Sequence, residues 1–143
     1  MFEKLMASAV LPASDIERAR KWWHDVLGRD PVFDDTDGEA LFYEVGGMGV
    51  MVYRTDFAGT AKNTAFNLIT DDLDRDMTEM RTHGVVFHDY DMPGLKTVDG
   101  VAEIGDDRSA WFSDSEGNII AIGEGAQMME MAMKLRSHAA GMG

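Results

Sequence analysis

The sequence predicts an α+β protein built from two successive βαβββ modules and a C-terminal helix. A strand and a capped helix near the N-terminus are followed by three short strands, and the same order recurs in the second half. The turn signal at 114–118 lies between two apolar runs and predicts a closing hairpin. We expect module one at about 5–56, module two at about 61–124 and the helical tail at about 126–138.

The first module begins with a predicted strand at residues 5–11, which Pro12 is expected to end. Ser14 is the expected N-cap of a helix, because Glu17 three residues later completes a capping box. Apolar residues then recur at helical spacing until Gly28, which is typical of a helix C-terminus. Three further strands are predicted at 32–33, 40–45 and 49–53.

The second module repeats this pattern. A strand is predicted at 63–69, and a helix follows from the Asp71-Asp72 pair to His83-Gly84. Superposing Asp72 on Asp15 also pairs Leu73 with Ile16 and Arg75 with Arg18. The remaining strands are expected at 85–88, 109–112 and 118–122.

Two segments have no counterpart in the first module. Residues 91–107 form an expected long loop, and a loop of this length is typical of a functional or partner-contacting segment. The tail places Met128, Met131 and Leu135 on one helical stripe. We interpret the stripe as core or subunit-interface packing, with a flexible wall over a hydrophobic ligand as the alternative.

Composition excludes several classes of function. The 143 residues are expected to form one domain, 1–143, and the absence of cysteine excludes disulfides and thiolate metal sites. The net charge of −13 disfavours nucleic acid as a partner. No apolar run reaches the ~18 residues of a membrane span, and no secretory signal is evident, so we expect a cytoplasmic protein. The acidity would attract cationic small molecules, or it serves only solubility.

The closing hairpin, with Asp114, Gly117 and Asn118 before an apolar strand, resembles that of the vicinal oxygen chelate superfamily, the glyoxalase, bleomycin-resistance and extradiol dioxygenase proteins. Further elements that resemble the superfamily are Ser14-Asp15, Ala19-Arg20, Trp22-Trp23, Val26-Leu27-Gly28, Asp71-Asp72-Leu73 and Gly84-Val85. The resemblance implies that the strands of each module curl into a half-open barrel around a ligand cleft. Two modules would share a cleft within one chain or across a homodimer, and a homodimer is our expectation.

Metal-using members of this superfamily hold a divalent ion with His and Glu side chains from the first and last strands of each module. The resemblance places these positions at Ser8, Met51, Ala65 and Ala121. None of the four suits Zn²⁺, Ni²⁺, Mn²⁺ or Fe²⁺, and a shift of one residue supplies no better ligand. We therefore predict no metal and no cofactor.

Without a metal, the resemblance implies a cleft of flat and small side chains. Its expected lining is Ser8, Val10, Tyr43, Met51, Tyr53, Ala65, Asn67, Trp111 and Ala121. Aromatic walls with a polar handle at Asn67 suit an aromatic or amphipathic small molecule. Bleomycin-resistance-like members sequester a cationic antibiotic, so antibiotic resistance is one expected role. The alternative for each aromatic residue is that it fills the barrel.

Two other functions stay open at the level of sequence. The first is a lyase, isomerase, epimerase or dioxygenase-type enzyme with a displaced metal or acid–base site around His88, for which Glu103, Asp91 and Glu44 are candidate partners. The second is a partner-binding protein that docks through its Met-rich tail and the Pro93-Gly94 loop. The simpler interpretation of His88 is a strand-edge histidine satisfied by neighbouring carboxylates.

Overall fold

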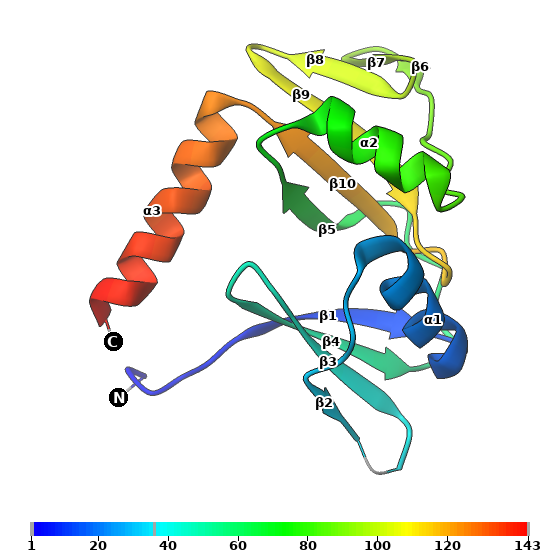
Figure 1. Ribbon diagram of the computed structural model, residues 1–143, viewed down its shortest axis with the longest axis vertical. Helices are drawn as coiled ribbons and strands as arrows, with labels where there is room; N and C mark the ends of the chain where they lie inside the picture. Colours follow the sequence, from blue (N-terminus) through cyan, green and yellow to red (C-terminus); the bar gives the residue numbers. More distant parts are fainter. Residues whose placement is uncertain (1, 36, 143) are drawn as a thin grey trace. The chain divides into compact units, whose positions relative to one another are not determined.

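The computed structural model describes residues 2–35 and 37–142 (Figure 1). The chain divides into two compact units, Met1–Lys62 with Asp114–Asn118 (unit 1) and Asn63–Ser113 with Ile119–Gly143 (unit 2). Each unit holds one sheet, of four strands in unit 1 and six in unit 2. Within the described ranges, no helix combines the length and the apolar character that a membrane crossing requires.

Unit 1 follows the predicted order of elements. They are β1 (Ser8–Ala13), α1 (Ile16–Leu27), β2 (Phe33–Asp34), β3 (Ala40–Val45) and β4 (Met48–Arg54). The sheet order is β1-β4-β3-β2, with β1 parallel to β4 and the other pairs antiparallel. Helix α1 packs against β3 and β4 through its apolar stripe, so the core of this unit lies between the helix and one face of the sheet.

The sequence prediction for α1 is wrong at the N-terminus of the helix and confirmed at its C-terminus. The predicted N-cap, Ser14, is wrong: Asp15 caps the helix, and its carboxylate accepts a hydrogen bond of 3.0 Å from the Arg18 amide. Ser14 is bonded instead to Glu116. Gly28 ends the helix as predicted, with a φ of 62° that favours glycine.

Strand β1 also differs from its prediction, because it starts at Ser8 and runs through Pro12 to Ala13. Proline is tolerated there because β1 is an edge strand, where a missing amide N–H costs no ladder hydrogen bond on the free side. The carbonyl of Pro12 accepts a hydrogen bond of 3.0 Å from the side-chain amide of Asn118.

Unit 2 contains the second module and the tail. Its elements are β5 (Thr64–Ile69), α2 (Leu73–Thr82), β6 (Asp91–Met92), β7 (Leu95–Val98), β8 (Val101–Ile104), β9 (Asp107–Ser113), β10 (Ile119–Glu124) and α3 (Ala126–Met142). The strands lie in the order β5-β10-β9-β8-β7-β6, and β5 is parallel to β10. Asp72 caps α2 as Asp15 caps α1, which confirms the repeat that the sequence predicts.

The predicted long loop at 91–107 is wrong, because these residues form β6, β7, β8 and the start of β9 and widen the sheet. Asp99 and Gly100 both have positive φ, 53° and 83°, which suits the tight turn between β7 and β8. The strand predicted at 85–88 is reduced to a single bridge between Phe87 and Phe112. The Asp99-Gly100 pair in the polar segment 91–107 is therefore a turn between two strands and not part of a long loop.

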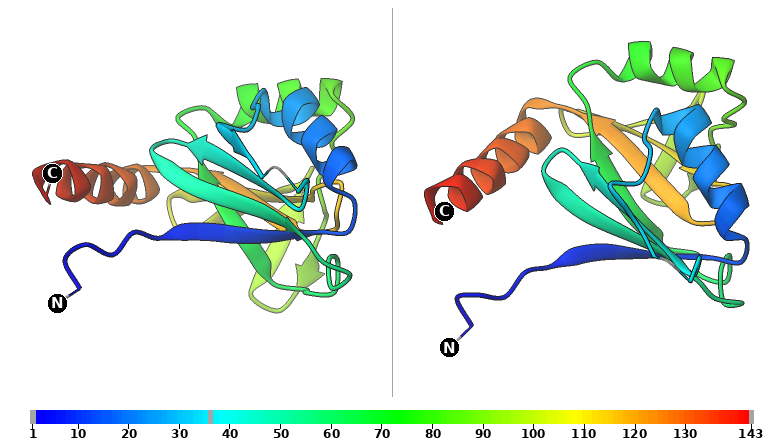
Figure 2. Two further views of the ribbon diagram at one scale, coloured as in Figure 1. Left: turned by 90° about the horizontal axis from the view of Figure 1, so that it is seen from below. Right: turned by 60° about the horizontal axis from the view of Figure 1, so that its bottom comes forward.

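Helix α3 contacts its own sheet only near its start. A Cβ atom on Gly123 would lie 2.7 Å from the sulfur of Met128, so the methionine packs directly against this glycine. Met131 and Leu135 are 46% and 65% exposed in the single chain. Beyond its first turns the helix extends away from the sheet of unit 2 (Figure 2). The predicted methionine stripe is thus half-buried at Met128 and exposed further along.

Candidate functional site

The sheet of unit 1 has a covered face and an open face. Strand alternation directs Leu41, Val50 and Val52 toward α1, where all three are buried. The opposite side, here called open face 1, carries Ser8, Val10, Phe42, Met51 and Tyr53. Val10 and Tyr53 are 50% and 39% exposed, and Met51 is half-buried. The structure therefore brings the predicted ligand-binding residues Ser8, Met51 and Tyr53 to one face.

Tyr43 is not on that face, and its prediction as a cleft residue is wrong. Its Cα pairs with that of Val50, so its side chain lies on the α1 side, and its ring stacks on Trp23 at 4.2 Å between centroids. The side chain is 1% exposed, and its hydroxyl has no hydrogen-bond partner within the described ranges. Burial raises the pKa of Tyr43 to about 12. Phe42, one residue earlier, occupies the expected position.

The sheet of unit 2 has the same two sides. Helix α2 covers Phe66, Phe112, Ile120 and Ile122, which are all buried. The opposite side, open face 2, carries Asn67, Ala121 and Trp111 side by side, because β10 pairs Ala121 with Asn67 on one side and with Trp111 on the other. Asn67 is exposed and Trp111 half-buried. The small Ala121 therefore lies between an amide and an indole.

One end of open face 2 is occupied by the tail helix. Gly123 and Ser109 form the next cross-strand pair after Ala121 and Trp111 on this face, and the Met128 side chain lies against Gly123. Ala121 is itself buried, so the accessible part of open face 2 consists of the exposed Asn67 and Ser113 and the half-buried Trp111 and Ile119.

A hydrogen-bonded chain of three side chains, the Tyr90–His88–Ser113 chain, lies beside Trp111. His88 Nδ1 is 2.9 Å from the Tyr90 hydroxyl, and His88 Nε2 is 3.1 Å from Ser113 Oγ. The His88 amide donates to the Trp111 carbonyl at 2.8 Å, which places the imidazole next to the indole on open face 2. Both ring nitrogens are therefore used, and His88 is satisfied by hydroxyl groups instead of the expected carboxylates.

The support behind this chain comes from the strands that replace the predicted loop. Thr97 Oγ1 on β7 accepts a hydrogen bond of 2.8 Å from the Tyr90 amide and donates to Asp89 Oδ1 at 2.9 Å. Thr97 is buried. The Tyr90 ring then contacts Trp111 edge-on, with centroids 5.8 Å apart. Sequence reasoning missed Ser113, Tyr90 and Thr97, although strand alternation from Trp111 identifies Ser113 as a neighbour on the same face.

The predicted catalytic pairing of His88 with Glu103 is wrong. Glu103 pairs with Arg108 on β9, and Arg108 bonds to Asp74 of α2, so Glu103 lies on the covered side of the sheet. There it lines a groove of about 640 Å³ with Asp74 and the other residues Met77, Thr78, Arg81, Lys96, Val98, Asp99, Val101 and Arg108. The arginines of the groove are already bonded, Arg81 to a carbonyl and Arg108 to two carboxylates. The groove is therefore a weak candidate for the site.

The donor set does not fit the metal chemistry that the superfamily resemblance implies. The four corresponding positions are Ser8, Met51, Ala65 and Ala121, and Ala65 lies at the register shift of β5 while Asn67 pairs with Ala121. Within residues 2–35 and 37–142, no group of three or more His, Asp or Glu side chains is arranged to hold an ion. Neither open face thus offers a divalent cation a suitable set of ligands.

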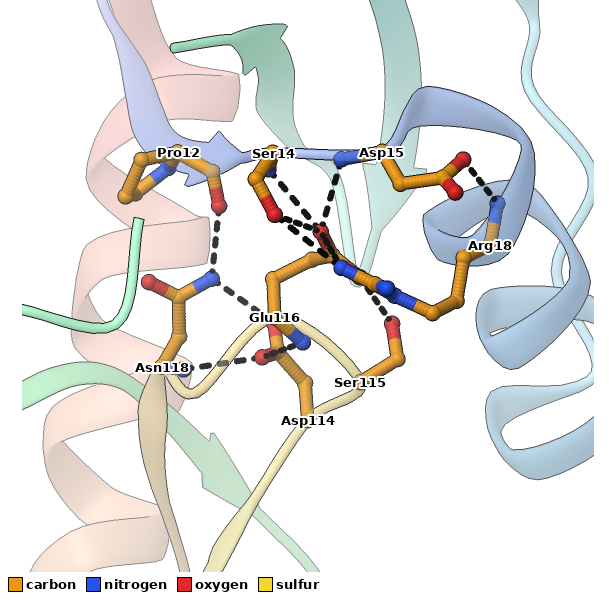
Figure 3. Close-up of polar contacts among 8 residues, drawn as sticks. All are labelled: Pro12, Ser14, Asp15, Arg18, Asp114, Ser115, Glu116 and Asn118. Atoms are coloured by element: carbon orange, nitrogen blue, oxygen red, sulfur yellow. Dashed lines mark hydrogen bonds and ion pairs between the residues drawn. The ribbon is translucent and has the colours of Figure 1, made fainter. Parts of the chain in front are cut away.

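The turn that carries the motif residues has a structural role in unit 1 (Figure 3). Glu116 Oε1 accepts hydrogen bonds from the Ser14 and Asp15 amides at 2.9 and 3.0 Å, and Arg18 Nε donates to Oε2 at 2.7 Å. Its side chain is 1% exposed. Burial by itself would raise the pKa, but the hydrogen bonds led by Arg18 outweigh it and lower the pKa of Glu116 to about 2.

Asp114 organises the turn itself. Its Oδ1 accepts from the Glu116 and Asn118 amides at 2.9 and 2.8 Å, and its Oδ2 accepts from the Asn118 side chain. Burial raises the pKa of Asp114 above its ordinary value despite these bonds. Asp114 and Asn118 therefore shape the hairpin turn.

Comparison with known proteins identifies the fold. No protein-family model and no curated protein matches the sequence. Among solved structures, the chain is similar to an antibiotic binding protein, TnmS3, from a Streptomyces species, with 24% identity, a TM-score of 0.60 and coverage of 86% of this chain and 98% of that one. It is also similar to lactoylglutathione lyase from Agrobacterium tumefaciens, with 17% identity, a TM-score of 0.63 and coverage of 85% and 94%.

A third similar structure is the fosfomycin resistance protein FosX from Listeria monocytogenes, solved with Mn(II) and sulfate. It shares 11% identity at a TM-score of 0.65, and the match covers 86% of this chain and 91% of that one. The chain therefore has the vicinal oxygen chelate fold of glyoxalase-like enzymes and antibiotic-binding or resistance proteins, as the sequence resemblance predicts.

Proposed function

We propose that this protein binds an aromatic or amphipathic small molecule on its open faces without a metal ion. The observation that carries the proposal is the side-chain set on open face 2, where the half-buried Trp111 offers a flat apolar surface, Asn67 supplies an exposed amide and the small, buried Ala121 lies between them. Such a combination of apolar walls and few polar groups suits small-molecule binding. Open face 1 adds Met51 and Tyr53, of the same character.

The charge of the chain favours a cationic ligand. A net charge of −13 raises the local concentration of cations around the protein. The antibiotic-binding TnmS3 has the same fold, which makes antibiotic-like compounds the first class to screen. A homodimer belongs to this proposal, because the exposed apolar side chains of α3, such as Leu135, are available for subunit packing.

The test is calorimetric titration with aromatic cations, with and without a chelator, on the wild type and Trp111→Ala. We expect binding that the chelator leaves unchanged and that Trp111→Ala weakens about tenfold, since stacking on an aromatic side chain contributes about 1 kcal/mol or more. Trp22→Ala is the matched control, because Trp22 lies on α1. Binding that requires Mn²⁺ or Ni²⁺, or that survives Trp111→Ala unchanged, would overturn the proposal.

Acid–base catalysis is the second candidate, and the hydrogen bond between His88 and Ser113 favours it. An imidazole within hydrogen-bond reach of an exposed hydroxyl can accept its proton. Mass spectrometry of a bound compound after incubation distinguishes the two functions. Conversion by the wild type that His88→Asn abolishes would establish an enzyme, whereas unchanged compound supports binding alone.

A further inference from the structure

The Tyr90–His88–Ser113 chain is a polar feature on a largely apolar surface. Its inner members, Tyr90 and His88, are half-buried, and its outer member, Ser113, is exposed. A serine hydroxyl has one donor and two acceptor sites, and the contact with His88 uses only one of them. Ser113 therefore has capacity to bond a molecule that occupies open face 2.

The tautomer of His88 decides what Ser113 offers. When Nε2 carries the proton it donates to Ser113, and the serine O–H is free to donate to a ligand. In the other tautomer Ser113 donates to Nε2 and presents its lone pairs. Ser113 can thus donate a hydrogen bond to a carbonyl oxygen or accept one from a hydroxyl group without a change in its position.

The position of Ser113 matches the surface on which a ring would pack. Ser113 follows Trp111 by two residues on β9, so the two side chains lie on the same face about 7 Å apart along the strand. That spacing is close to the sum of two lengths, about 4 Å from the centre of a two-ring aromatic system to a substituent oxygen and about 3 Å for a hydrogen bond from that oxygen. A ring against Trp111 can therefore direct a substituent oxygen at Ser113.

The site is held in place before any ligand arrives. Thr97 and Asp89 fix the Tyr90 backbone, the Tyr90 hydroxyl bonds to His88, and the Tyr90 ring contacts Trp111. Groups that need no reordering lose less entropy on binding than mobile ones. The added strands thus hold Tyr90, and through it His88, in position on open face 2 through Thr97 of β7.

We propose that Ser113, positioned by His88 and Tyr90, binds a hydroxyl or carbonyl oxygen of an oxygenated aromatic ligand whose ring packs on Trp111. This inference rests on the proposed function, since it names the ligand class and the polar contact of the same face. It assigns recognition to Ser113 and positioning to His88 and Tyr90.

The experiment compares two probes, a hydroxynaphthalene and naphthalene itself, by calorimetry or by quenching of tryptophan fluorescence. We expect the wild type to bind the hydroxynaphthalene about five- to tenfold more tightly, the range of one net hydrogen bond. Ser113→Ala should remove this preference and leave naphthalene binding unchanged. Tyr90→Phe should reduce the preference about two- to threefold, because the hydroxyl that orients His88 is absent.

Thr64→Val is the matched control, since Thr64 is an exposed hydroxyl residue of the same sheet whose strand partner, Ile119, also pairs with Ser113. It should retain the full preference. If both probes bind the wild type equally, or if Ser113→Ala keeps the preference, the inference is overturned and the proposed function stands. If neither probe binds, the inference is overturned, and the titration with aromatic cations decides the proposed function separately. Covalent labelling of Ser113 by a fluorophosphonate would also overturn the inference, because the serine would then be a nucleophile.

Discussion

The two modules share a backbone plan, but their open faces differ in chemistry. Both begin with an edge or near-edge strand and a helix capped by aspartate, Asp15 in one and Asp72 in the other. Open face 1 presents Val10, Met51 and Tyr53, whereas open face 2 adds the Tyr90–His88–Ser113 chain. The added chain depends on β7, which the first module lacks. The extra strands of the second module therefore support a polar site that the first module does not have.

The helix N-termini show a second difference of the same kind. A glutamate from outside each helix accepts a hydrogen bond from a backbone amide there, Glu116 for α1 and Glu124 for α2. Glu116 is 1% exposed and bonds Arg18, while Glu124 is 24% exposed and bonds Arg108. A carboxylate at a helix N-terminus should therefore stabilise the fold more at the buried Glu116 than at the more exposed Glu124, because the electrostatic interaction is stronger where water is excluded.

The largest effect is expected for Glu116→Gln, which removes a buried charge and leaves Arg18 without its carboxylate partner. The fall in pKa from 4.5 to about 2 corresponds to roughly 3 kcal/mol of free energy of unfolding. Chemical denaturation should show this loss, against about 1 kcal/mol for Glu124→Gln. Glu17→Gln is the control on the surface of α1, where Glu17 is 77% exposed, and should change stability by less than about 0.5 kcal/mol. Equal losses in the free energy of unfolding for Glu116→Gln and Glu124→Gln would show that burial does not strengthen this interaction.

The same variant makes a signed pH prediction. Because the folded-state pKa of Glu116 is lowered, its stabilisation is present above the unfolded value of 4.5 and is lost as the pH falls through about 2. The difference in stability between the wild type and Glu116→Gln should therefore be full at neutral pH and shrink toward zero near pH 2. A difference that is independent of pH would show that shape, and not charge, matters at this position.

Thr97→Val should give the next largest effect, because it keeps the size of the side chain and deletes a buried hydroxyl. The Tyr90 amide would lose its acceptor, and Asp89 one donor, at a cost of about 2 kcal/mol in the free energy of unfolding. Thr78→Val, on the exposed surface of α2, is the control and should change stability little. An unchanged denaturation midpoint for Thr97→Val would remove the claim that β7 supports the polar chain.

Tyr43→Phe should have the smallest effect and the opposite direction. Removal of a buried hydroxyl that lacks a partner in the described ranges should leave stability unchanged or raise it by up to about 1 kcal/mol. Ligand binding should not change, because the ring lies on the α1 side of the sheet. A clear loss of affinity, measured beside Tyr53→Phe, would restore Tyr43 to the ligand site.

Local patterns in the sequence determined much of the architecture. Helical spacing and Gly28 locate α1 to within two residues, and superposing Asp72 on Asp15 reveals the repeat in the sequence itself. These features depend on neighbours three or four residues apart along one chain segment, so sequence is sufficient for them. The hairpin motif at Asp114 to Asn118 likewise indicated the fold, because its turn geometry depends on local hydrogen bonds.

Tertiary structure alone decided what the faces carry. Tyr43 lies in the core and Phe42 on open face 1, one residue away from the prediction, because successive side chains of a strand point to opposite sides of the sheet. His88 acquired Ser113 as a partner, and not Glu103, because strand pairing joins residues distant in sequence. Glu116 reaches the N-terminus of α1 only through contacts that span about a hundred residues of the chain. Long-range pairing sets which polar groups meet, and no local pattern encodes that choice.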